Sequence, residues 1–488
     1  MSDGRSLKAD AFLGVKWTTL SSLTAIIAKF LQIAILARYL TPEDFGLVGI
    51  VMVVVGFAQV FTDAGMSAAI VQRQNITNNQ LSSLYWLNIF SGIAVFCAVW
   101  AVAPVAASFF KEETLKDLFR LSAATFLIIP FGQQFQFLLQ KELKFDTISK
   151  IDVASTLFGA ALSIALAIFG FGASSIILGA LFSALIKSLS LLSKGILMYM
   201  PRLYFKYSDI KDFLSFGLYQ MGEKSLNYFA SRVDQLIIGK YLGSEQLGYY
   251  NIAFNLVIQP VSRINPIINR VAFPLYAQVQ NDNERLKRGF LQTTRYLTLI
   301  NFPLLAGLAA VANPFVSTVY GPQWAPCAPI IQILAFIGIL RSRGNPIGSL
   351  VIAKGRADLS FKWVLFVAIA SAAMLLIVVK HGIIATAFSL AIFGAITFVL
   401  GYFVLTRPLI GKCSKGIFVD TFLIPLTYSI LMAFPVSFIA SNVSLADPLL
   451  LAICVIFGAL LYAVLMMIFE KRTITEIFNH LKNKSKKH

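Results

Sequence analysis

Long apolar stretches separated by short polar ones dominate the chain. A helix that crosses a bilayer needs about 20 consecutive apolar residues, and hydropathy at that length predicts about fourteen spans. Two longer runs are divided by tight turns at 170–172 and 380–382, since one helix of more than about 40 residues would far exceed the bilayer thickness. The predicted spans are 15–38, 45–63, 84–109, 118–139, 151–170, 174–199, 213–240, 248–273, 290–315, 327–350, 360–379, 382–405, 418–440 and 448–469.

Composition supports this interpretation. Hydrophobic residues make up 57% of the 488 positions and charged residues only 13%, whereas a soluble globular protein carries about 25% charged residues. The N-terminus has no short apolar core followed by a small-residue cleavage site, so no removable signal peptide is predicted. The sequence therefore predicts an all-α polytopic membrane protein.

Basic residues are distributed unevenly between the predicted loops. With the N-terminus in the cytoplasm, almost every loop lysine and arginine falls on the inner side, and the outer loops hold essentially Lys111, Lys116 and Lys380. This bias predicts an even number of spans with both termini cytoplasmic. The same bias explains the formal net charge of +18, so no nucleic-acid partner is predicted.

An internal repeat divides the chain. Tyr39, Leu40, Glu43 and Gly46 recur as Tyr241, Leu242, Glu245 and Gly248, each displaced by 202 positions. The loop 139–150 similarly resembles 353–362, and each precedes a pair of apolar segments. These matches predict two parallel six-helix repeats, forming two lobes, with two extra helices. The predicted divisions are 1–200, 201–406 and 407–488.

Catalytic and metal-binding signatures are not found in the sequence. The four cysteines are scattered, the three histidines form no cluster, and no nucleotide-binding loop, serine-nucleophile elbow or zinc-protease motif occurs. No enzymatic activity and no bound cofactor are predicted. Energy for transport would come from an H⁺ or Na⁺ gradient, from product consumption, or from a partner.

The span 213–240 carries the most informative polar residues. On a continuous helix, Glu223, Asn227 and Asp234 fall on one face, and Lys224 and Arg232 lie in the same span. Each charge at bilayer depth costs roughly 2.5–3.5 kcal/mol even on insertion scales, so such residues mark pathways. The alternative is a structural seam of interhelical hydrogen bonds and ion pairs, for example of Glu223 or Asp234 with Arg263.

Further polar residues extend the candidate site. Asn255 and Asn269 share a face of the span 248–273, with Arg263 and Arg270 on its flank, and Lys29 lies in the middle of the first span. Cations therefore outnumber acids, which suits an anionic head group because guanidinium groups bind phosphate well. Glu223 and Asp234 are candidates for binding the coupling H⁺ or Na⁺. Arg341 and Arg343, near the inner end of a span, are interpreted as snorkelling.

The stretch 37–74, ARYLTPEDFGLVGIVMVVVGFAQVFTDAGMSAAIVQRQ, resembles the N-terminal signature of Wzx-type polysaccharide exporters. The segment 239–274 fits the same group, the colanic-acid and teichuronic-acid branch of the multidrug/oligosaccharidyl-lipid/polysaccharide flippase superfamily. The resemblance implies two helical lobes around a cationic cavity in the bacterial inner membrane. It also implies a substrate, undecaprenyl-diphosphate-linked oligosaccharide, and membrane lipids, a polysaccharide polymerase and assembly proteins as candidate partners.

Two other functions fit the sequence less well. A multidrug antiporter of the same superfamily would favour an acid-rich cavity for its cationic substrates, whereas this chain is base-rich. A membrane polysaccharide polymerase or ligase would need a sizeable outer loop with ionisable residues, and no predicted outer loop exceeds about 15 residues. The sequence therefore favours a flippase that works by alternating access.

Overall fold

A computed structural model describes residues 7–63, 70, 76–443 and 445–471 of the chain. For some of these, including residues 7–16 and Arg270, only the backbone is described. Every regular element in this described part is a helix, as expected for a membrane-spanning chain, because a helix satisfies its own backbone hydrogen bonds in lipid. The chain divides into two compact units, Met1–Gly248 and Tyr249–His488.

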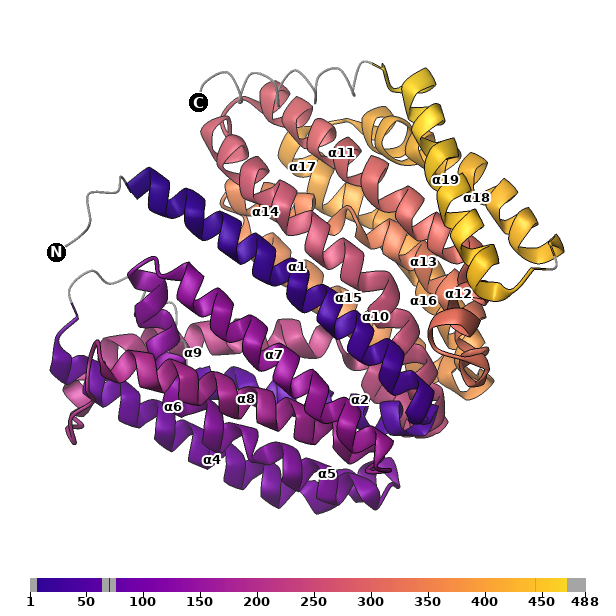
Figure 1. The fold of residues 1–488 in the computed structure, drawn as a ribbon. Helices are drawn as coiled ribbons and strands as arrows, with labels where there is room; N and C mark the ends of the chain where they lie inside the picture. The colour runs from indigo at the N-terminus through magenta and orange to yellow at the C-terminus, as the bar shows by residue number, and fades with distance from the viewer. Residues whose placement is uncertain (1–6, 64–69, 71–75, 444, 472–488) are drawn as a thin grey trace. The chain divides into compact units, whose positions relative to one another are not determined.

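The first unit is built from the helices drawn from indigo to magenta in Figure 1. They are α1 (Leu7–Tyr39), α2 (Pro42–Asp63), α4 (Asn78–Phe110), α5 (Thr114–Ala123), α6 (Thr125–Lys141), α7 (Phe145–Ile168), α8 (Ala173–Ile196), α9 (Tyr207–Ala230) and the first part of α10 (Val233–Gln278).

Small residues allow α7 and α8 to approach each other closely. A Cβ built on Gly159 of α7 would lie 2.8 Å from the carbonyl oxygen of Gly179 on α8, and one built on Gly179 would lie 2.5 Å from Cβ of Ser163. In the membrane, where lipid is as apolar as leucine, such close packing supplies much of the attraction between helices. The helix α7 also packs on α1, and α8 packs on α6.

The second unit begins within α10 and ends with α19. It contains α11 (Asn283–Ala310), α12 (Ala312–Val319), η1 (Pro322–Trp324), α13 (Cys327–Arg341), α14 (Gly344–Ala353), α15 (Ala357–Val378), η2 (Val379–His381), α16 (Ile383–Gly401), η3 (Tyr402–Thr406), α17 (Arg407–Ile410), η4 (Lys415–Leu423), α18 (Ile424–Asn442) and α19 (Asp447–Phe469).

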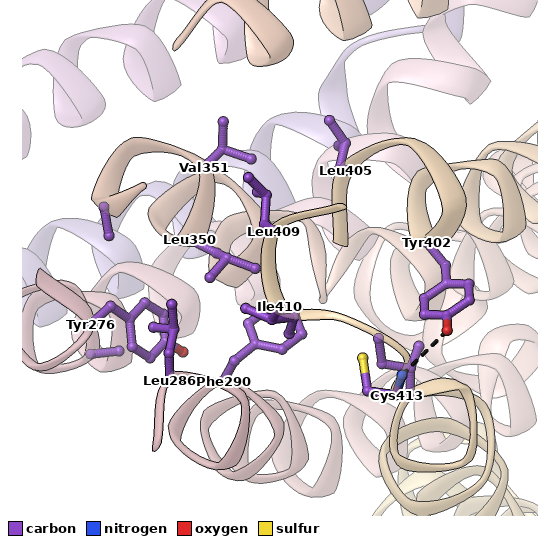
Figure 2. Packing of buried hydrophobic residues seen from close by; sticks show 13 residues of the cluster. Tyr276, Leu286, Phe290, Leu350, Val351, Tyr402, Leu405, Leu409, Ile410 and Cys413 are labelled. Carbon is purple, nitrogen blue, oxygen red and sulfur yellow. Dashed lines mark hydrogen bonds between the residues drawn. The ribbon is translucent and has the colours of Figure 1, made fainter. Parts of the chain in front are cut away.

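A buried apolar cluster joins α10, α11, α14, η3, α17 and η4 (Figure 2). Tyr276 of α10 packs beside Phe290 of α11, with ring centroids 6.5 Å apart. Leu350 of α14 and Ile410 of α17 complete the packing, and both are buried. The amide N–H of Cys413 donates to the hydroxyl oxygen of Tyr402 at 3.3 Å, which connects the loop after α17 to η3. This cluster fixes the ends of α10 and α11 relative to α14 and α17.

All fourteen expected spans are helical, and the all-α polytopic fold is confirmed. Ten helices of the described residues are long and apolar enough to cross a membrane singly, and α11 with α12, bent by 73°, makes an eleventh. The three other expected spans depart from simple spanning helices. The span 118–139 is divided between α5 and α6, and the spans 213–240 and 248–273 carry the polar residues of the candidate site.

Both predicted turns between paired apolar segments are present, and each ends in a glycine with positive φ. Gly172 (φ 52°) precedes α8 and Gly382 (φ 95°) precedes α16. The loops before the preceding helices also match, because Leu143 (φ 57°) and Gly355 (φ 67°) each stand two residues before α7 and α15. These equivalent backbone positions agree with two parallel repeats. The division at 1–200, 201–406 and 407–488 stays a prediction.

Candidate functional site

The predicted span 213–240 is two helices rather than one. The helix α9 ends at Ala230 and α10 begins at Val233, so the expectation of a continuous helix was wrong. Near the break, the hydroxyl of Ser231 donates to the carbonyl oxygen of Tyr228 at 2.8 Å. Serine can bind nearby backbone in this way instead of continuing a helix, and this local competition favours an end to α9.

The break changes the polar stripe expected on this span. Glu223 and Lys224 lie exposed on α9, whereas Asp234 lies in the first turn of α10 and is only 5% exposed. One carboxylate oxygen of Asp234 accepts the amide N–H of Gln235 at 2.9 Å. The angle of 100° per residue used for the stripe does not hold across the turn at 231–232, so Glu223 and Asp234 are not two positions of one helix face.

Arg232 occupies the turn between the two helices. Its side chain is half-buried, and Nη1 donates to the side-chain oxygen of Gln235 at 3.1 Å. Gln235 is itself buried at 3% exposure. The junction therefore places a cation, a buried acid and a buried amide within four consecutive positions of the chain.

Lys29 stands apart from this junction, on α1. The residue is exposed, and its ammonium nitrogen donates to the side-chain oxygen of buried Gln32 at 3.3 Å. The hydrogen bond follows the i, i+3 spacing of the helix. The one acceptor identified for Lys29 among the described residues is therefore a neutral amide on its own helix.

The second part of α10 carries the other predicted residues. Asn255 and Arg263 are exposed, and the amide of Asn255 donates to the carbonyl oxygen of Asn251 at 2.8 Å. Asn269 is half-buried, and its side-chain oxygen is buried without a hydrogen-bond partner among the described residues. The side chain of Arg270 lies outside the described part. The polar character of this helix is therefore divided between an exposed portion and a buried portion.

Two charged features were missed or misread in the sequence. Asp152 of α7 and Lys187 of α8 form an ion pair at 2.8 Å, with both side chains more than a third exposed. Their spacing along the chain gives no sign of the pairing, which depends on how α7 meets α8. Arg343 does not snorkel, because it is only 3% exposed. The described residues include no group of three or more His, Cys, Asp or Glu that could hold a metal ion.

Comparison with known proteins identifies the family. Residues 35–329 match the polysaccharide biosynthesis protein family. A teichuronic acid biosynthesis protein, TuaB of Bacillus subtilis, is 37% identical over 475 residues and covers 95% of this chain and 96% of its own. The chain belongs to this polysaccharide biosynthesis family. The lipopolysaccharide biosynthesis protein WzxC of Escherichia coli is 34% identical, covering 83% of each chain.

Comparison with solved structures shows which fold this chain adopts. The lipid II flippase MurJ, in an inward closed conformation, matches with a TM-score of 0.75 at 16% identity, covering 95% of this chain and 100% of its own. An inward-facing multidrug resistance MATE transporter of the MOP superfamily matches with a TM-score of 0.62 at 14% identity, covering 78% and 95%. The resemblance to Wzx-type exporters and the prediction of a transporter rather than an enzyme are confirmed.

Proposed function

We propose that this chain carries undecaprenyl-diphosphate-linked oligosaccharide from the inner to the outer face of the bacterial cytoplasmic membrane. Its relatives are named for different polysaccharides, which are teichuronic acid and lipopolysaccharide, and a succinoglycan relative from Rhizobium meliloti, 26% identical, is named as a transport protein. The syntheses of such different polysaccharides can share one step, which is the transport of lipid-linked repeat units across the membrane. The distribution of loop charges supports cytoplasmic termini.

The observation that carries this proposal is the exposure of a charged side chain on a helix within a predicted span. Arg263 on α10 is exposed, although hydrocarbon cannot satisfy a charge. Such residues need water or a polar ligand beside them. A diphosphate with its glycan offers a complementary anion, while the polyprenyl chain stays in lipid. Arg263 would hold the phosphate oxygens through the planar donors of its guanidinium.

Coupling to an ion is a second part of the proposal. Asp234 is the better candidate of the two acids, because it is buried whereas Glu223 is exposed. A buried carboxylate changes its protonation or binds a cation in response to small structural changes. We propose that Asp234 takes up H⁺ or Na⁺ during the transport cycle.

The test is transport of lipid-linked oligosaccharide by the full chain in proteoliposomes. The readout is the fraction of fluorescent lipid-linked oligosaccharide that becomes accessible to a membrane-impermeant quencher. Wild type should move the lipid, and Arg263→Ala should lower the initial rate by about ten-fold or more, the factor given by roughly 1.4 kcal/mol of lost binding. Arg285→Ala is the matched control, since Arg285 is exposed in the first turn of α11 and pairs with Asp282 at 3.2 Å.

The outcomes separate the competing functions. A wild-type protein that expels organic cations and moves no lipid-linked oligosaccharide would be a drug antiporter. Equal initial transport rates for Arg263→Ala and wild type would show that Arg263 does not bind the substrate. For coupling, an imposed H⁺ or Na⁺ gradient should accelerate wild type and leave Asp234→Asn unaffected. Acceleration of both proteins would exclude Asp234 as the coupling group.

A further inference from the structure

Arg343 is a buried cation whose charge no described residue neutralises. It stands at the turn between α13 and α14 and is only 3% exposed. Both Nε and Nη1 are buried without a hydrogen-bond partner within the described part of the chain. A guanidinium group does not readily lose its proton. A charge taken out of water without a partner is strongly unfavourable, so another species must satisfy it.

One face of the guanidinium is already covered. The ring of Phe398 on α16 lies 4.3 Å from the guanidinium carbon. This cation–π contact offsets part of the charge, but it leaves the in-plane N–H groups of Nε and Nη1 open. Because the open donors belong to two nitrogens, the missing species must accept at least two hydrogen bonds.

The residue before Arg343 belongs to a buried polar network that is wholly neutral. The amide of Asn265 on α10 donates to the carbonyl oxygen of Ser342 at 2.9 Å. Its side-chain oxygen accepts from the amide of Asn301 on α11, also at 2.9 Å. All three residues are at most 1% exposed. The network thus brings α10 and α11 against the turn that holds Arg343, and it adds no negative charge there.

Two side-chain amide oxygens on α10 and α11 also lack a hydrogen-bond donor in the described part of the chain. The side-chain oxygen of Asn301 is buried without a hydrogen bond in the described part, and so is that of Asn269, one helical turn after Asn265. These oxygens are acceptors and can bind the hydrogens of water. Asn301 is joined through Asn265 to the residue before Arg343, and Asn269 follows Asn265 on α10, so these acceptors belong to the elements that meet the turn of Arg343.

We propose that the interior of the second unit binds one small monovalent anion of the halide class at Arg343. A single negative charge balances a single guanidinium, whereas a divalent oxyanion would leave an excess charge buried. Water bound to the anion would donate to the amide oxygens of Asn269 and Asn301. Asn269 is also among the residues predicted for the path of lipid-linked oligosaccharide, but the proposal does not depend on that function.

The site also has a structural consequence. The turn at 342–343 separates α13 from α14, and the hydrogen bonds of Asn265 fasten α10 and α11 to it. An anion bound only to the folded arrangement stabilises that arrangement by mass action. The second unit should therefore become more resistant to unfolding as halide concentration rises, with a saturating dependence.

The experiment measures thermal unfolding of the purified full-length protein in detergent. Sodium chloride or bromide is compared with sodium gluconate at constant ionic strength, and sulfate and phosphate are tested separately. In wild type, halide should raise the unfolding midpoint by several degrees and the rise should saturate. Arg343→Met, which removes the charge and keeps an unbranched side chain, should lose the rise. Arg341→Met is the matched control, because Arg341 is exposed two residues away, and it should retain the rise.

Each remaining outcome decides against the proposal. An unfolding midpoint independent of halide would leave water as the only partner of Arg343, and an equal rise in Arg343→Met would be a general salt effect. A rise with sulfate or phosphate but not with halide would assign the site to an oxyanion. If Arg343→Met does not fold, anomalous scattering from bromide-soaked wild-type crystals decides, since bromide must then appear beside Arg343 and its absence there overturns the site.

Discussion

The backbone carbonyl oxygen of Ser244 occupies the space that a side chain on Gly46 would need. A Cβ built on Gly46 would lie 1.7 Å from that oxygen, and a Cβ built on Gly248 would lie 1.8 Å from the carbonyl oxygen of Pro42. Adding 202 to the numbers of Gly46 and Pro42 gives those of Gly248 and Ser244. The two contacts are therefore equivalent, and the two copies of the repeated motif pack on each other with approximate two-fold symmetry.

This relationship predicts that Gly46→Ala damages the protein. The added methyl group meets backbone rather than a flexible side chain, so α2 must move away from the backbone of Ser244. Overpacking of this kind costs about 1–3 kcal/mol, and small residues at such crossings allow helices to approach in membranes. The unfolding midpoint in detergent should fall by several degrees, and lipid transport should fall with it.

The matched control for Gly46→Ala is Gly222→Ala. Gly222 is exposed on α9, and a Cβ there would meet no atom within 4 Å. Alanine favours a helix over glycine by about 0.8–1.0 kcal/mol, so this variant should be as stable as wild type or more stable. A Gly46→Ala protein with the stability of Gly222→Ala would contradict the tight contact.

Asp44 ties the start of α2 to the start of α8. One carboxylate oxygen accepts the amide and hydroxyl hydrogens of Thr41, both at 2.9 Å, and the other accepts the amide N–H of Ala173 at 2.9 Å. Asp44→Ala should cost about 2 kcal/mol, because it removes the carboxylate that accepts hydrogen bonds at the starts of two helices. Hydrogen exchange should accelerate at the first turn of α8. Glu43→Ala, at the exposed neighbouring position, should leave that exchange unchanged.

Glu470 and Arg295 fasten the end of α19 to α11. The carboxylate of Glu470 is 2% exposed and lies 2.5 Å from Nη2 of Arg295, whose side chain is about a third exposed. Glu470→Gln should cost about 2 kcal/mol, because it leaves a partly buried cation without its acid. Limited proteolysis should detect earlier release of α19. Glu284→Gln is the control, since this 75% exposed acid pairs with Lys287 at 3.6 Å. Equal protease sensitivity of Glu470→Gln and Glu284→Gln would show that the ion pair does not hold α19 on α11.

The pair of Asp152 and Lys187 should behave differently from a surface ion pair. Both residues lie on helices long and apolar enough to cross the membrane, where a lone charge costs roughly 2.5–3.5 kcal/mol. Asp152→Asn and Lys187→Gln should each lower the unfolding midpoint. The double variant should be more stable than either single variant, because no charge then remains without a partner. Additive losses would show that both groups face water.

The helices could be located from sequence better than the breaks within them. Each predicted span is formed by helices, but the hydrophobic pattern does not mark the turn at Ser231 and Arg232, because apolar residues continue on both sides of it. The break at Gly243 (φ 85°, ψ 175°) could have been found, since a glycine with positive φ stands where Thr41 stands in the first copy of the motif. A glycine is the usual sign of such a backbone position.

The candidate site was only partly accessible to sequence analysis. Lys224 and Arg263 were selected because they interrupt apolar spans, and this criterion needs no knowledge of neighbours. The same criterion misplaced Arg343, because its distance from the end of a span suggested snorkelling whereas packing against Phe398 buries it. The roles of the predicted binding and coupling residues stay predictions.

By itself the sequence determined that this chain is a bundle of membrane-spanning helices in two related repeats and a member of an exporter family. These properties follow from runs of apolar residues matched to bilayer thickness and from motifs repeated along the chain, both of which are local in sequence. Only the tertiary structure decided that Gly46 packs on Ser244, that Asp152 pairs with Lys187 and that Arg343 is buried. Burial and pairing depend on which helix faces meet, and contacts between residues far apart in the chain settle that.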